Sequence, residues 1–306
     1  MLKRYKNVAA QASDMTHHTG VQGRSLMRDA RDRFVRNKAA MVCLFVLTLV
    51  VLFVLLGPLL AVWDNETIDW ANMGITGAPS IESGHFFGTD DLGRDLYSRS
   101  IQATGTSLMV GLVGASMALV IGVAWGVIAG YYGGWLDSVM MRIVDILLAV
   151  PTVLILILIL VVAGRSFTAL FIGLGAVSWL TMARIVRAQT MALKGREFIE
   201  AARAGGVSET VIIFRHILPN LLGVVIVYAS LLVPDMILAE SFISFLGLGI
   251  SEPSTSLGSL IAAGAGTMAY GTLWQLIFPL TFYVTIIITM FFIGDGLRDA
   301  LDPKDR

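Results

Sequence analysis

Long uncharged, hydrophobic stretches alternate with polar segments along this chain and predict where it crosses a membrane. Residues 39–62 are 24 consecutive positions without a charged side chain, and a helix needs about 20 apolar residues to cross a bilayer core. Because 253–293 is uncharged but too long for one helix, we expect 253–275 to be a loop or re-entrant segment. The pattern predicts an all-α polytopic membrane protein with six transmembrane helices. The five spans after the first are expected at about 105–130, 146–164, 166–183, 221–245 and 276–293.

The polar segments between these spans predict the organisation and orientation of the chain. Loops rich in Lys and Arg face the cytoplasm. With six spans, the segments on one side contain 19 Lys and Arg, and the opposite loops contain three. Both termini are therefore predicted to be cytoplasmic. The predicted units are an N-terminal segment 1–38, a first transmembrane helix 39–62, an outer loop 63–104, a five-helix core 105–293 with a cytoplasmic loop 184–220, and a tail 294–306.

Composition supports a membrane protein and excludes other classes. Hydrophobic residues make up 56% of the chain and charged residues 14%, against about 25% charged in soluble domains. The mean hydropathy is +0.77, which excludes intrinsic disorder. The formal net charge is zero, so no basic field favours nucleic-acid binding.

The sequence lacks the signatures of an enzyme. Its four histidines, His17, His18, His85 and His216, form no His-Glu-x-x-His pair, and its single cysteine, Cys43, cannot join a zinc-binding cluster. It also lacks the Gly-x-x-x-x-Gly-Lys-Ser/Thr loop that holds nucleotide phosphates. We therefore predict no catalytic residues, no metal site and no cofactor in this chain.

Small and charged residues inside the spans suggest packing contacts. Gly122, Gly126 and Gly130 are spaced four apart, so they lie on one helix face that allows another helix to approach closely. That helix could belong to this chain or to another subunit. Arg142 and Asp145 are three residues apart, and we predict that they form a structural ion pair at the cytoplasmic edge.

Two acids in the outer half of the fifth span leave a different function class open. Asp235 and Glu240 follow Pro234, and carboxylates inside a span face protein or an aqueous path. A proton-coupled secondary transporter would use such groups. The repeated halves and matching broken helices expected of that class are not found in the sequence.

The cytoplasmic loop 184–220 contains a predicted short helix. Residues 196–204 fit a helix that ends at the paired glycines Gly205 and Gly206. Ser208 is a plausible N-cap for a second, apolar helix that ends at 218–220. The first helix presents small residues beside Glu197, Glu200 and Phe198, a surface suited to insertion into a cleft on another protein.

This loop resembles the cytoplasmic signature of permease subunits of ABC importers, Glu-Ala-Ala-x3-Gly-x9-Ile-x-Leu-Pro. His216 stands at the isoleucine position, a variant similar to the peptide-transporter branch. The resemblance implies that the signature residues couple the chain to an ATPase. The matching residues are Glu200, Ala201, Ala202, Gly206, Leu218 and Pro219.

The segment 87–95 is similar to the outer-loop motif of the C-type permease subunits of oligopeptide, dipeptide and nickel importers, and 294–303 is similar to their tail. The motifs at 23–26, 82–85 and 302–306 are most similar to the oligopeptide subunit. The resemblance implies a periplasmic docking role for the outer loop. The residues assigned to docking are Gly88, Thr89, Asp90, Gly93, Arg94 and Asp95.

The resemblance implies a type I ABC importer permease fold in the bacterial inner membrane. The expected partners are a homologous B-type permease, two cytoplasmic ATPase subunits, a periplasmic peptide-binding protein and an oligopeptide substrate. ATP and Mg would be bound by the ATPases. Dipeptide, glutathione or nickel transport by the same branch remain alternatives, and a proton-coupled transporter or a membrane enzyme fit less well.

Overall fold

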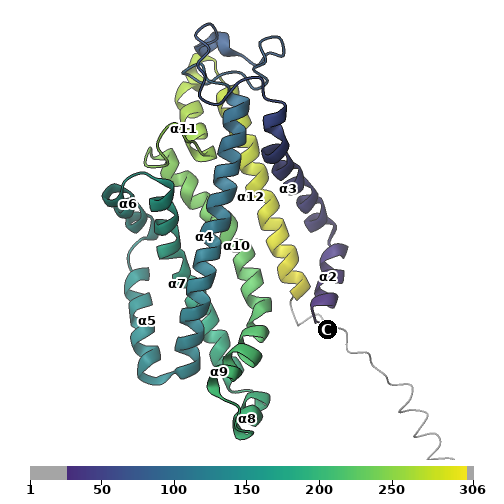
Figure 1. Ribbon diagram of the computed structural model, residues 1–306, viewed down its shortest axis with the longest axis vertical. Coiled ribbons are helices and arrows are strands. Elements are labelled where there is room, and N and C mark those ends of the chain that lie inside the picture. The colour runs from purple at the N-terminus through teal and green to yellow at the C-terminus, as the bar shows by residue number, and fades with distance from the viewer. Residues whose placement is uncertain (1–25, 302–306) are drawn as a thin grey trace, which may run out of the picture.

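The computed structural model describes residues 26–301, and it is an elongated bundle of helices (Figure 1). The expectations for residues 1–25 and 302–306 lie outside these residues. They include His17, His18, three of the four residues of the motif at 23–26 and the whole motif at 302–306. The helices are α2 (Leu26–Arg36), α3 (Lys38–Leu56), α4 (Leu96–Tyr132), α5 (Gly134–Leu148), α6 (Thr152–Ala163), α7 (Phe167–Lys194), α8 (Glu197–Ala204), α9 (Glu209–Ile212), α10 (Leu218–Phe245), α11 (Leu257–Thr267) and α12 (Trp274–Leu301).

Between residues 26 and 301, five helices are long and apolar enough to cross a membrane. A sixth span is formed only if α5 and α6, which are bent by 81° relative to each other, are counted together. The prediction of one continuous helix over 146–164 is therefore wrong, because the chain bends within this segment. The break between Leu148 and Thr152 contains Pro151, which has no N–H to donate and disfavours helical geometry in the residue before it.

Helices α4, α7 and α12 extend beyond the uncharged stretches that predicted them, whereas α3 ends at Leu56, before the end of the expected first span 39–62. The α4 helix begins at Leu96 rather than near 105, α7 continues to Lys194, and α12 continues to Leu301. Charged residues end a hydrophobic run without ending a helix, because backbone hydrogen bonds do not depend on whether side chains are apolar. The loop predicted to be cytoplasmic therefore begins after Lys194 rather than at 184, and much of the predicted tail is helical.

The prediction that an apolar helix ends at 218–220 is also wrong. The chain remains helical from Glu209 to Phe245, with one π-helical turn at Ile213–Ile217 immediately before α10. That turn shifts the hydrogen-bonding register next to Pro219, which cannot donate a backbone hydrogen bond. The loop segment is thereby joined to the membrane span as one continuous helix.

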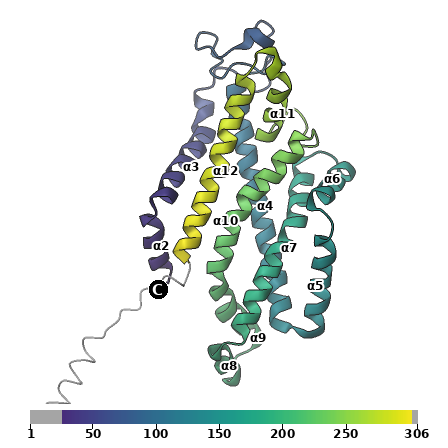
Figure 2. The same cartoon turned by 180° about the vertical axis from the view of Figure 1, so that it is seen from behind.

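The predicted glycine face of α4 packs against α7 of the same chain. A Cβ atom added to Gly122 would lie 2.6 Å from Met182 Cβ, and one added to Gly126 would lie 2.6 Å from the Ala183 carbonyl oxygen. At Gly130 the corresponding distance to the Arg187 carbonyl oxygen is 2.7 Å. The structure thus places an intrachain helix, rather than another subunit, on this face, and Figure 2 shows α4 and α7 running together.

A pair of identical substitutions tests this close contact. Gly126→Ala should destabilise the protein by about 1–3 kcal/mol, the usual cost of overpacking. Gly223→Ala, in α10, should be neutral or stabilise by up to about 1 kcal/mol, because no atom lies within 4 Å of its added Cβ. Thermal unfolding of the purified complex checks the difference. A midpoint for Gly126→Ala equal to that of the parent would contradict the packing argument.

The two ends of the bundle differ in structure. Figure 1 places the loop between α3 and α4, together with α11, at one end, and α8, α9 and the start of α5 at the other. The helix α2 and the last turns of α12 lie toward the α8 end. The short helix α11 lies within the segment predicted to be a loop or re-entrant structure, and it is too short for a span.

Candidate functional site

The predicted coupling helix is present as α8, and glycines end it. Glu197–Ala204 are helical, and Gly205 and Gly206 follow directly. Gly206 has a φ of +79°, a left-handed conformation that glycine adopts without steric cost. Ser208 precedes α9 at the expected N-cap position, but its side chain makes no capping hydrogen bond.

The two faces of α8 have different environments. Ile199 is completely buried and packs in a hydrophobic cluster with Ile212 and Ile217. Phe198 is 45% exposed, and Glu200 and Ala201 are exposed as well. One face of α8 is thus an apolar anchor, and the other is a free surface of small, acidic and aromatic side chains. The free surface can enter a cleft on a partner.

The structure separates the signature residues into two groups. Glu200, Ala201 and Gly206 are exposed at α8, where a partner could contact them, and Ala202 is half-buried. Leu218 and Pro219 begin α10, so they belong to the junction between the loop and the membrane span. The signature therefore describes a helix together with the connection that holds it.

A polar cluster centred on Tyr131 attaches α8 to the end of α4. The Tyr131 hydroxyl donates a hydrogen bond to the Glu209 carboxylate. Arg203 of α8 donates to the Tyr131 oxygen at 3.3 Å and to Glu209 at 3.3 Å. Lys194, at the end of α7, lies 5.6 Å from the centre of the Tyr131 ring. These contacts join α4, α7, α8 and α9 at a single point.

Sequence reasoning missed this cluster because its members are far apart in the chain and no motif relates them.

The hydrogen bonds to Tyr131 and Glu209 raise the pKa of Arg203 above its usual value. Arg203 therefore stays charged at any physiological pH.

The predicted ion pair between Arg142 and Asp145 is wrong. Asp145 instead pairs with Arg184 of α7, with 2.5 Å between the nitrogen and the carboxylate oxygen. In the same region Arg187 donates to both oxygens of Asp137, one of them at 2.5 Å. The carboxylates of α5 are paired with the arginines of the neighbouring helix, a relation that spacing within one helix cannot reveal.

The outer-loop residues assigned to docking are mostly internal. Five of the six are buried, and Arg94 is intermediate. The Thr89 carbonyl accepts hydrogen bonds from Trp274 at 3.1 Å and from Gln275 at 2.9 Å. Gly88 has a φ of +79°, and an added Cβ would lie 2.5 Å from the Gly77 carbonyl oxygen. Direct docking through the buried five is therefore wrong, and one of them, Thr89, instead holds the loop onto α12.

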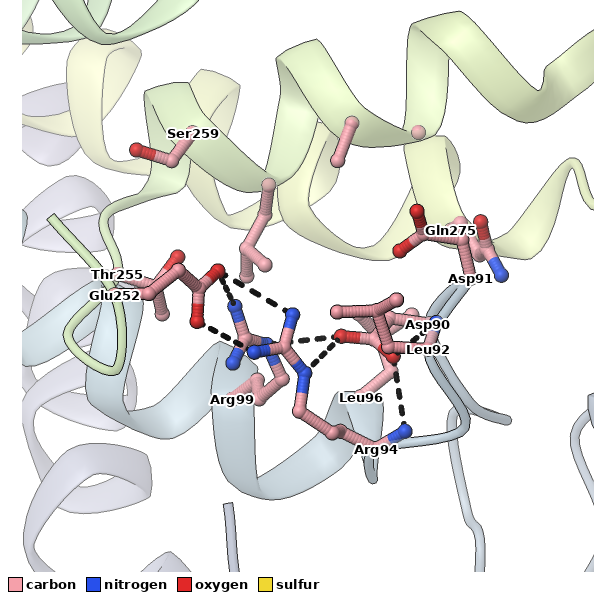
Figure 3. A pocket seen from close by; sticks show the side chains of 13 residues that line it. Asp90, Asp91, Leu92, Arg94, Leu96, Arg99, Glu252, Thr255, Ser259 and Gln275 are labelled. Carbon is pink, nitrogen blue, oxygen red and sulfur yellow. Dashed lines mark hydrogen bonds and ion pairs between the residues drawn. The ribbon is translucent and has the colours of Figure 1, made fainter. Parts of the chain in front are cut away.

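A network of two arginines and two carboxylates connects this loop to the segment before α11 (Figure 3). Arg94 Nε lies 2.8 Å from Asp90, and Arg94 Nη1 lies 2.5 Å from Glu252. Arg99, whose side chain is 3% exposed, lies 3.3 Å from Asp90 and 3.2 Å from Glu252. The four side chains border a cavity of about 180 Å³ that Thr255, Ser259 and Gln275 also line.

The arginines of this network keep Glu252 ionised. Burial pushes its pKa upward, but the hydrogen bond from Arg94 and the charges of both arginines outweigh burial and hold the pKa below its usual value. Sequence reasoning did not single out Glu252, which is 158 residues from Arg94.

His85 forms a second connection within the outer loop. Its Nδ1 lies 2.9 Å from Asp95 and its Nε2 lies 3.3 Å from Asp69. The ring stacks on Trp63 with 4.7 Å between centroids. Hydrogen bonds from Asn72 and from the backbone N–H of Ala71 lower the pKa of Asp69, so its carboxylate is ionised at neutral pH.

The structure does not bring Asp235 and Glu240 together. Glu240 is fully buried and accepts hydrogen bonds from Ser244 at 2.6 Å and from Ser107 of α4 at 3.4 Å. Asp235 is exposed. Five residues along a helix correspond to about 140° of rotation, so the two carboxylates point to different sides of α10.

Comparisons with known proteins identify the family. Residues 122–306 match the family of binding-protein-dependent transport system inner membrane components, and residues 25–79 match the N-terminal transmembrane domain of oligopeptide transport permease C. The oligopeptide transport system permease protein OppC of Escherichia coli is 54% identical over 286 residues, covering 94% of each chain. That of Haemophilus influenzae is 47% identical over 97% of this chain and 94% of its own.

A solved structure confirms the predicted fold. A chain of the MetNI methionine ABC transporter in an inward-facing conformation matches with a TM-score of 0.56 at 21% identity, covering 67% of this chain and 96% of that chain. The fold is that of a type I ABC importer permease. The chain therefore belongs to the family of binding-protein-dependent transport system inner membrane components, in the branch of oligopeptide transport permease C.

Proposed function

We propose that this chain is the C-type permease subunit of an ATP-driven importer that moves oligopeptides across the bacterial inner membrane. It would pair with a homologous B-type permease and contact two cytoplasmic ATPase subunits, which bind ATP and Mg. A periplasmic peptide-binding protein would deliver the substrate to the outer end. The chain itself would supply no ATPase site, and both its termini would be cytoplasmic.

The strongest support is the match over 94% of the chain to oligopeptide permeases, combined with the exposed face of α8. That face contains the signature residues Glu200 and Ala201. The Tyr131 cluster fixes the other side of α8 to two long membrane helices. A short helix attached in this way moves as a rigid body with those helices when a partner ATPase closes.

At the opposite end, the exposed part of the outer loop would contact the binding protein. Trp70 is 77% exposed, Ile81 86% and Leu92 46%. Aromatic and aliphatic side chains held on a firm scaffold favour protein docking. The buried residues Gly88, Thr89, Asp90, Gly93 and Asp95 would act indirectly, by keeping these side chains in place.

Affinity purification from native membranes, followed by reconstitution into liposomes, tests the proposal. We expect a second permease and two ATPases to be recovered with the chain. With the binding protein and ATP, the complex should accumulate oligopeptides in preference to dipeptides, glutathione or nickel. Recovery of the chain alone in mild detergent, or uptake driven by a proton gradient without ATP, would contradict it.

A further inference from the structure

Asp235 is an exposed carboxylate inside a membrane span. It lies well within the helical segment Glu209–Phe245, and no described residue forms a hydrogen bond or ion pair with its carboxylate. A charged side chain in the hydrocarbon core is costly, and such residues face protein or water rather than lipid. This side of α10 therefore faces something other than lipid in the assembled protein.

The residues that share this side of α10 with Asp235 are aromatic and aliphatic. Tyr228 and Phe242 lie seven positions before and after Asp235, and Leu238 lies three positions after it, so all four lie on one helix face. Tyr228 is 40% exposed, Leu238 38% and Phe242 51%. Glu240 points away from this face, toward the serine hydroxyls that bind it. The face is thus a hydrophobic stripe with a single negative charge.

A hollow continues this stripe toward the outer end. Its volume is about 400 Å³, within the range of about 300–1,000 Å³ typical of sites for small ligands. Leu238 and Phe242 belong to both the stripe and the hollow. Helices α10, α11 and α12 contribute the lining side chains, which are mainly apolar: Leu238, Ser241, Phe242, Phe245, Ile261 and Tyr283.

We propose that this surface lines the path of the transported peptide and that Asp235 binds the peptide's N-terminal ammonium group. The inference rests on the importer function proposed above. An apolar surface accepts side chains of many kinds, whereas the free ammonium is a charge common to oligopeptides of any sequence. A carboxylate attracts that end and repels the C-terminal carboxylate. Asp235 would therefore orient the peptide without selecting its sequence.

Thiol accessibility tests the position of Asp235. In a Cys43→Ala background, which removes the single native cysteine, Asp235→Cys in the reconstituted complex should react with a charged, water-soluble methanethiosulfonate reagent. Saturating peptide should slow that reaction. Leu52→Cys is the matched control, since Leu52 is 41% exposed on α3 and should stay unreactive in lipid. An unreactive Asp235→Cys variant, or one whose reaction saturating peptide does not slow, would overturn the proposal.

Uptake measurements test the ammonium contact. Asp235→Asn keeps the shape and removes the charge, and it should lower ATP-driven uptake of a peptide with a free amino terminus about tenfold. Asp235→Glu should restore at least half of the uptake. Co-purification of the partner subunits controls for assembly. Parental uptake by Asp235→Asn would overturn the ammonium contact, whereas failure of the parent complex to accumulate any peptide with ATP would instead refute the importer function.

Discussion

Replacing Ala201 by tryptophan is expected to block most ATP-driven uptake while leaving the chain folded in the membrane. Ala201 is exposed on α8, so a large side chain there can extend away from the chain and leave the buried anchor at Ile199 intact. On the proposed function, the same side chain would occupy the space into which α8 inserts on the ATPase. Uptake should fall at least about tenfold, as expected when a tightly packed interface centre is disrupted.

Ser138→Trp provides the matched control for this prediction. Ser138 is also exposed and lies near the start of α5, at the same end of the bundle as α8. The control variant should retain peptide uptake and should still co-purify with the ATPase subunits. Uptake by Ala201→Trp within twofold of the parent would show that α8 does not enter the ATPase through this face.

The sequence predicted the membrane architecture well because hydrophobic burial in a bilayer is a local property of each segment. The second, fifth and sixth expected spans lie inside long apolar helices, and the first and fourth overlap such helices except for residues 60–62 and residue 166. The short helix over 196–204 is also confirmed, with its end at the paired glycines. These features depend on composition, length and backbone conformation, which neighbouring residues in the sequence determine.

The errors have a common physical origin in contacts between distant segments. Asp145 was expected to pair within its own helix, but Arg184 lies opposite it on α7. Asp90 was expected to face a partner, yet it is buried beside Arg94 and Arg99. Periodicity within one segment does not specify which other segment it packs against, so sequence reasoning could find these residues but not their neighbours.

The Asp90→Asn substitution is expected to uncouple the outer loop from the rest of the protein. Asp90 is 5% exposed, and its carboxylate accepts hydrogen bonds from the backbone N–H groups of Leu92 and Arg94 and from the Arg94 side chain. Its loss leaves the buried Arg99 with Glu252 as its one remaining carboxylate, since no other described acid lies within ion-pair distance. Removing one partner of a buried ion pair costs about 3–5 kcal/mol, enough to release the loop locally.

The outer loop and α8 lie at opposite ends of the bundle. This variant should therefore lose the response to the binding protein and keep the contact with the ATPases. The ATPases should still co-purify with Asp90→Asn, but stimulation of ATP hydrolysis by the binding protein should fall toward the basal rate. Asp91→Asn is the matched control, because Asp91 is adjacent and exposed and should leave stimulation unchanged. Full stimulation with Asp90→Asn would mean that the arginine–carboxylate network does not hold the surface that the binding protein contacts.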